Sequence, residues 1–300
     1  LLIQNFKFTL ILVFEILMKK FIPLYKPSIT NNEKKNVLSC LRDKWISSKG
    51  KFVTEFERSF KKKFKYKFAT VTTNGTTALH LALLALNIKE GDEVIVPNLT
   101  YISACNAVSY VKAKPILADV DEDTWLMDEY SIKRCISKKT KAIILVHLYG
   151  LPYNFEKIKK IINKYNLKVV EDCAEAVGST YKGSYIGNFG DVSTFSFYGN
   201  KTITTGEGGM VVTKSKKIYK KIVKLKSQGL NISKKNNYYN HEVIGYNYRM
   251  TNICASIGLA QLKRIDFLIK RKKEINELYN KFLDTSNLSF QKDNKYCEST

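Results

Sequence analysis

A lysine in a glycine-rich connection is the first residue whose type and setting suggest chemistry. Lys201 precedes the run 204–209, Thr-Thr-Gly-Glu-Gly-Gly, and lies between strand-like segments at 192–197, expected to be half-buried, and 209–213. Such a connection leaves the amine little room to reach water, and desolvation lowers the pKa of an amine. Because a neutral amine attacks carbonyl carbon, Lys201 is a candidate Schiff-base lysine. The competing interpretation is a solvated surface charge, common in a chain with 50 Lys and Arg residues.

A second candidate feature could bind a phosphate. The strand-like segment 68–72 is followed by Thr-Asn-Gly-Thr-Thr at 73–77 and then by a predicted helix over 78–86. A strand, small polar residues and a helix start present free backbone N–H groups to an anion. Gly75 and Thr76 could therefore hold a phosphate, although an ordinary helix cap explains the same residues equally well.

Side chains able to do chemistry also follow three other predicted strands. Short apolar strands that alternate with helices predict an α/β domain with a mostly parallel sheet. Ligands in such sheets lie at the carboxyl ends of the strands, so these side chains are expected to share one site with Gly75. They are Tyr101 after strand 93–97, His147 after strand 141–146 and Asp172 at the end of strand 168–172.

These candidates match what pyridoxal phosphate requires: an imine to a lysine, anchors for a phosphate, a ring stack and an acid beside the pyridine nitrogen. Asp172 would keep that nitrogen protonated, so that the ring can take up electrons from a carbanion. A single aspartate is often only a helix cap. The joint order of the residues favours the cofactor.

Composition limits the other classes of function. The formal charge is +23, with 50 Lys and Arg against 27 Asp and Glu, but no basic stripe interleaved with aromatic residues suggests nucleic acid. A cationic surface could instead attract an anionic small substrate. The six cysteines are scattered without a C-x-x-C pair, so neither a metal site nor a redox motif is expected. We expect reduced thiols in a cytoplasmic protein.

The N-terminal residues contain an apolar run at 9–18 that is too short to span a bilayer and includes Glu15. It lacks a small-residue cleavage site typical of a signal peptide. We expect Met18 to be the natural start and residues 1–17 to be a non-native or disordered extension. A membrane-associating segment is the alternative.

The elements that position the candidates are mainly helices. Phe52, Phe56, Phe60 and Phe64 recur every four residues and predict an amphipathic helix that packs on the core. The other predicted helices span 31–41, capped by Ser28 or Thr30, 102–110, 155–165, 216–226 and 253–283, the last broken near Asp266, while 228–242 is expected to be an irregular polar loop.

The sequence also resembles the DegT/StrS-type sugar aminotransferases, a family with the type I PLP-transferase fold. The resemblance covers about Ile22 to Lys272, and its motifs keep their order and spacing. They are WISSKG, TNGTTALHLALLAL, GDEVIVPNLTYIS, KAIILVHLYGLP, VVEDCAEAVGS, GDVSTFSFYGNKTITTGEGGMVVT and IGYNYRMTNICASIGLAQL.

The resemblance implies a role for each residue around the cofactor ring. Lys201 would carry pyridoxal 5'-phosphate and move the proton at the amino acid's Cα. Asp172 would bind the pyridine nitrogen, and Tyr101 would stack on the ring. Glu175 stands where many relatives have Gln or His near the 3-hydroxyl. His147 is expected to be structural.

The resemblance also implies the phosphate anchors and a homodimer. Gly75, Thr76 and Ser196 would hold the phosphate. Asn247 matches an asparagine that reaches the phosphate of a neighbouring subunit, so two subunits would share each site. Arg249 lies in the same motif, and the resemblance assigns it no definite role.

The implied activity is transfer of an amino group from L-glutamate to the 4-keto group of GDP-4-dehydro-6-deoxy-mannose for surface polysaccharide. Residues 18–245 would form the large cofactor-binding domain, and 246–300 the start of a small C-terminal lobe that is incomplete, since family members continue further. The last residues, 287–300, are polar and carry no motif.

Three alternatives remain. The substrate could be a UDP- or dTDP-linked 4-keto-6-deoxy sugar. The chain could instead be a truncated, non-catalytic protein that binds the cofactor. A sugar dehydratase of the same family is disfavoured, because such relatives replace the lysine at position 201 with histidine.

Overall fold

The computed structural model describes residues 23–231, 240–284, 286, 288–293 and 296–300. The apolar run 9–18 and the proposed start at Met18 lie outside these residues. Among the helices that are described, none is long and apolar enough to cross a membrane.

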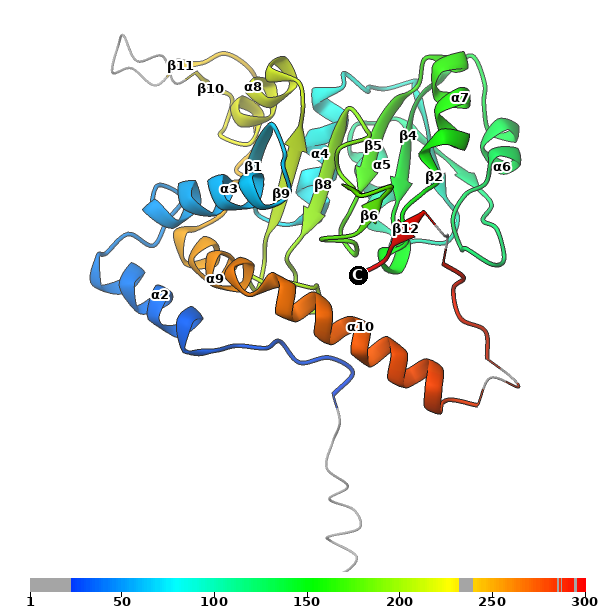
Figure 1. Ribbon diagram of the computed structural model, residues 1–300. Coiled ribbons are helices and arrows are strands. Elements are labelled where there is room, and N and C mark those ends of the chain that lie inside the picture. Colours follow the sequence, from blue (N-terminus) through cyan, green and yellow to red (C-terminus); the bar gives the residue numbers. More distant parts are fainter. Residues whose placement is uncertain (1–22, 232–239, 285, 287, 294–295) are drawn as a thin grey trace, which may run out of the picture.

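A seven-stranded sheet forms the centre of the molecule (Figure 1). Every neighbouring pair of strands in it is parallel except the two pairs that involve β9, which runs antiparallel to both β1 and β8. The prediction of an α/β fold with a mostly parallel sheet is thereby confirmed. In spatial order the strands are β1 (Phe68–Thr72), β9 (Gly209–Thr213), β8 (Val192–Ser196), β5 (Lys168–Asp172), β4 (Thr140–Val146), β2 (Glu93–Pro97) and β3 (Lys114–Ala118).

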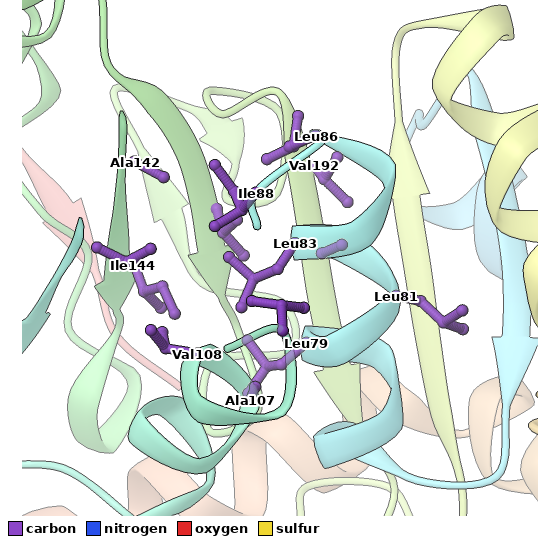
Figure 2. Packing of buried hydrophobic residues seen from close by; sticks show 14 of the residues in the cluster. Leu79, Leu81, Leu83, Leu86, Ile88, Ala107, Val108, Ala142, Ile144 and Val192 are labelled. Carbon is purple, nitrogen blue, oxygen red and sulfur yellow. The ribbon is translucent and has the colours of Figure 1, made fainter. Parts of the chain in front are cut away.

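Helices cover both faces of this sheet, because successive residues of its strands point to opposite faces and both sets are apolar. In β2, Val94 and Val96 pack in one core cluster and Ile95 in another. Figure 2 shows Leu79 and Leu83 of α4 beside Ala107 and Val108 of α5 in the first cluster. One face carries α4 (Gly75–Ala85), α5 (Ser103–Tyr110) and α8 (Lys216–Leu225), and the other α3 (Lys51–Lys63), α6 (Glu129–Arg134), α7 (Phe155–Tyr165) and α9 (Asn252–Lys263).

Strand β8 corrects one expectation. The prediction of a half-buried strand is wrong, because every residue of β8 is buried. Val192 packs under α4, and on the other face the Phe195 ring lies 5.2 Å from the ring of Phe60. A polar residue in β8 does not indicate exposure to water. Ser193 is buried and donates to a Glu171 carboxylate oxygen inside the core, at 3.1 Å.

Two helix starts bear on the site. Helix α2 (Asn31–Arg42) is capped by Thr30, which is one of the two predicted caps. Helix α4 begins at Gly75, three residues earlier than predicted, because the Asn74 side chain accepts the Thr77 N–H at 2.9 Å and caps the helix there. Gly75 and Thr76 are therefore its first two residues, where backbone N–H groups have no partner within the helix.

The predicted long helix is broken near Asp266, as expected: it consists of two helices, α9 and α10 (Ile265–Phe282), which are separated at Arg264. Helix α9 packs into the same apolar cluster as α3, and the proposed domain boundary at residue 245 stays a prediction. The remaining short elements are η1 (Leu148–Gly150), β6 (Thr180–Tyr181), β7 (Ser184–Tyr185), β10 (Leu230–Asn231), β11 (Asn240–His241) and β12 (Cys297–Glu298).

The aromatic cluster around Phe60 provides a test of how the core is packed. Phe60 is fully buried, and rings of α3, β8 and the segments that follow them surround it. Phe60→Ala should lower the free energy of unfolding by about 3–5 kcal/mol, because the cavity cannot close around so many rings. Denaturant titration measures the loss. Phe282→Ala is the matched control, because Phe282 is 71% exposed and its loss should change stability little. Equal losses for the two variants would contradict this packing.

Candidate active site

Lys201 lies in the connection between β8 and β9, as the sequence predicted for its surroundings. Its side chain is 17% exposed, and its amine lies 3.3 Å from a carboxylate oxygen of Glu175. The second oxygen of Glu175 accepts the backbone N–H of Tyr149 at 2.9 Å, which fixes the direction of the carboxylate. The site therefore contains an amine and a carboxylate held together, a pairing that the sequence did not reveal.

Asp172 ends β5, and the parallel register places it beside Val146 of β4 and Thr194 of β8. Its carboxyl is buried, and burial raises its pKa to about 6, against the opposing effects of the Ala174 N–H and the Lys201 charge. The Ala174 N–H donates to this carboxyl at 3.0 Å. A buried carboxyl with few donors favours a cationic partner.

Gly75 and Ser196 face one another where β1 leads into α4 and β8 ends. A Cβ atom at position 75 would lie 2.9 Å from the Ser196 Cβ, so only glycine allows the start of α4 to approach the end of β8 this closely. In the described part of the chain, the backbone N–H groups of Gly75 and Thr76 have no acceptor. The positive end of the helix dipole and free N–H groups, with the Ser196 hydroxyl beside them, favour an anion at this position.

The structure does not join every candidate to this centre. Tyr101 follows β2 but is 76% exposed, and Asn247 is exposed, with its side-chain oxygen accepting from Arg249 at 3.1 Å. Within the described residues, no hydrogen bond or ion pair links Tyr101 or Asn247 to Lys201 or Asp172.

His147 and Glu171 form a buried pair behind the site, with His147 Nε2 3.2 Å from a Glu171 oxygen. Burial alone would raise the pKa of the Glu171 carboxyl, but the hydrogen bond from His147 and the N–H groups of Gly190 and Gly187 outweigh it and lower the pKa. With Cys173, these side chains lie close enough to hold a metal ion. Because N–H groups already occupy the Glu171 oxygens, the geometry favours a structural role.

Sequence reasoning missed Lys272, a fourth charged residue beside the site. This residue of α10 donates to the Thr202 hydroxyl at 3.0 Å, next to Lys201 in the chain. Nothing local distinguishes Lys272 from the other lysines of a basic, amphipathic helix, because the contact joins residues 70 positions apart. Only the packing of α10 against the connection that carries Lys201 reveals it.

These features fit pyridoxal phosphate. The unpartnered N–H groups of Gly75 and Thr76 suit its phosphate, and the buried carboxyl of Asp172 suits a protonated ring nitrogen. Lys201 supplies the amine, close enough for its charge to act on Asp172. The fold and this set of donors define a pyridoxal-phosphate-dependent enzyme.

Comparison with known proteins identifies the family. Residues 27–297 match the model of the DegT/DnrJ/EryC1/StrS aminotransferase family, so the chain belongs to that family and is a pyridoxal-phosphate-dependent aminotransferase. The match extends to residue 297 and so includes most of the tail, which carried no recognisable motif in the sequence.

Individual relatives agree with this membership. The chain is 56% identical over 266 residues to the GDP-perosamine synthase of Escherichia coli O157:H7, covering 89% of this chain and 72% of that one. It is 47% identical over 258 residues to the GDP-perosamine synthase of Vibrio cholerae, covering 86% and 70% of the two chains. The structure of Spr1654 from Streptococcus pneumoniae in its PLP form superposes with a TM-score of 0.85 at 32% identity, covering 93% and 76%.

The raised pKa of Asp172 makes stability depend on pH in the cofactor-free protein. The pKa moves from an ordinary 3.8 to about 6, so the folded state holds the extra proton between these values. Stability from this group is present below about pH 4 and is lost as pH rises through about 6, a change of about 3 kcal/mol. Asp172→Asn should remove that component. Denaturant titrations of both proteins from pH 4 to 7 measure the difference, and parallel stability curves would contradict the raised pKa.

Proposed function

We propose that this aminotransferase moves an amino group from L-glutamate to the 4-keto group of GDP-4-dehydro-6-deoxy-mannose, giving GDP-perosamine. The observation that carries the proposal is the close setting of Lys201, Glu175 and buried Asp172 at the carboxyl ends of adjoining strands. The substrate follows from the 56% identity to a GDP-perosamine synthase. Such a product would serve surface polysaccharide (O-antigen) synthesis.

We assign the cofactor contacts as follows. Gly75, Thr76 and Ser196, which lie close together at the start of α4, would bind the phosphate. Asp172 would bind the ring nitrogen, and its ionised form would be stabilised by that positive charge. Tyr101 would cover the ring, since its side chain is free to turn.

The remaining roles concern the proton. Pyridoxal phosphate, when bound, supplies an electron-withdrawing ring that stabilises charge developing on the amino donor's Cα. The Lys201 amine would take the proton from that Cα and return it in the course of each half-reaction. Glu175, at 3.3 Å, would keep the amine pointed into the site.

We also propose a cytoplasmic homodimer. Asn247 is exposed and separate from the centre described above, as expected of a residue that completes the site of a second copy. The large domain would span 18–245, with 246–300 leading into a small lobe.

The substrate is tested by supplying glutamate with GDP-, UDP- and dTDP-linked 4-keto-6-deoxy sugars in parallel. We expect amine transfer to the GDP-linked sugar, measured as 2-oxoglutarate formed and amino sugar detected by mass. Transfer to the UDP- or dTDP-linked sugar alone would overturn the assignment, as that result belongs to the alternative nucleotide-sugar aminotransferases. No transfer by cofactor-loaded protein would favour a non-catalytic binding protein.

Lys201→Ala should abolish transfer while the protein still folds, because the amine that moves the proton is lost. Turnover and the visible absorbance of the bound cofactor are the measurements. Lys216→Ala is the control, because Lys216 is an exposed lysine at the start of α8 and its loss should leave both unchanged. Retained turnover in Lys201→Ala would refute this role of the lysine.

A further inference from the structure

Helix α10 passes beside the connection that carries Lys201 and forms one wall of a cleft. Figure 1 shows α10, in orange, running along the edge of the sheet near the ends of β8 and β9. The cleft has a volume of about 1060 Å³. Its other sides are lined by residues 23–28, the connection 199–202 and the tail residues 290, 291, 293 and 297–300. Substrate that reaches Lys201 through this cleft passes the side chains of α10.

Lys272 is the residue of α10 whose charge lies nearest to the chemistry. Its amine donates to the Thr202 hydroxyl at 3.0 Å. Desolvation lowers the pKa of this amine, Glu175 acts against that shift, and the neighbouring charge of Lys201 adds to it. The residue as a whole is exposed, and its amine is partly buried where it contacts Thr202.

Among the residues that the structure describes, Lys272 has no carboxylate of its own. In the described part of the chain it forms no ion pair, whereas Arg271 lies 2.9 Å from Glu274 on the same helix. Glu175, the carboxylate nearest to the site's amines, is already paired with Lys201. A partly desolvated cation without a counter-ion in a cleft favours an anionic ligand.

The proposed substrates offer three anionic groups: the α- and γ-carboxylates of glutamate and the diphosphate of the nucleotide sugar. The distance from the reacting atom separates the α-carboxylate from the diphosphate. Lys201 must come within roughly 3 Å of the amino donor's Cα to move its proton, so the α-carboxylate, one bond further, lies within about 5 Å of the same amine. The diphosphate of a nucleotide sugar is attached to C1, across the pyranose ring from the 4-keto carbon. An anion site adjacent to Lys201 therefore suits the α-carboxylate better.

We propose that Lys272 binds the α-carboxylate of the amino donor and so determines the enzyme's preference for α-amino acids. This inference rests on the proposed function. Thr202 holds the Lys272 amine in position through its hydroxyl, and the positive charge then orients the donor with its Cα toward Lys201. Lys272 is thus a residue of the first half-reaction only.

The test compares Lys272→Met with Lys270→Met, a matched loss of charge on the same helix outside the cleft lining. The two half-reactions of the cofactor-loaded protein are followed separately by absorbance. In Lys272→Met the apparent dissociation constant of glutamate should rise at least about tenfold, as expected for loss of a charge-assisted hydrogen bond. The constant for the nucleotide sugar should stay within about twofold, and Lys272→Arg should retain most of the glutamate affinity.

Two amides of glutamate identify which carboxylate is bound. Isoglutamine lacks the α-carboxylate and glutamine lacks the γ-carboxylate. The native protein should discriminate against isoglutamine, and Lys272→Met should lose that discrimination. The preference of Lys272→Met between glutamate and glutamine should stay as in the native protein, because both compounds carry the α-carboxylate. Calorimetric titration with 2-oxoglutarate gives a readout apart from turnover, and its binding should weaken in Lys272→Met alone.

Several results would overturn the inference. Equal loss in both half-reactions would mean that Lys272 acts on Lys201 rather than on the donor, and a loss confined to the nucleotide sugar would assign it to the diphosphate. Glutamate constants alike in Lys272→Met and Lys270→Met would leave it without a role. If the native protein itself fails to react with glutamate, the proposed function fails instead, so the two failures are distinguishable.

Discussion

The site depends on two adjacent carboxylates at the end of β5 whose pKa values shift in opposite directions. Glu171 and Asp172 are neighbours in a strand, so their side chains leave opposite faces of the sheet. Glu171 accepts N–H groups of Gly187, Phe189 and Gly190 and is held ionised in the core. Asp172 is equally buried but meets few donors, and its pKa rises to about 6. At the end of one strand, Glu171 thus holds the neighbouring backbone on one face of the sheet, and Asp172 is available to the cofactor on the other.

Glu171 also holds β8, the strand that precedes Lys201, in position. The N–H groups bound by Glu171 belong to residues 187–190, directly before β8, and Ser193 within β8 donates to the same carboxylate. Phe195 lies on the same face of β8 as Ser193 and packs on the aromatic rings of α3, so both contacts hold the strand on that face. Lys201 therefore leaves the end of β8 from a fixed point, and Glu175 needs only to direct its amine.

The sequence predicted the parts of this arrangement that local pattern carries. Apolar runs and turn residues identify the strands, and a polar residue after each strand identifies the shared edge, which gives Lys201, Asp172 and Gly75 without any contact. The order of strands and the antiparallel β9 come from long-range pairing that a local pattern does not encode. The burial of β8 was missed because serine and threonine in the core look the same in sequence as at the surface.

Long-range charge pairing was the other part that sequence could not supply. Glu175 and Lys201 are 26 residues apart and Lys272 is 70 residues beyond Thr202, so only the fold joins them. Within the site, Lys201 and Lys272 oppose Asp172 and Glu175, so the formal charges balance although the chain carries +23. The excess charge must therefore lie elsewhere, where it acts on anions at long range and is weakened by salt. At short range an anionic substrate is bound instead by an individual cation that forms no ion pair with the protein. In this site, among the described residues, that cation is Lys272.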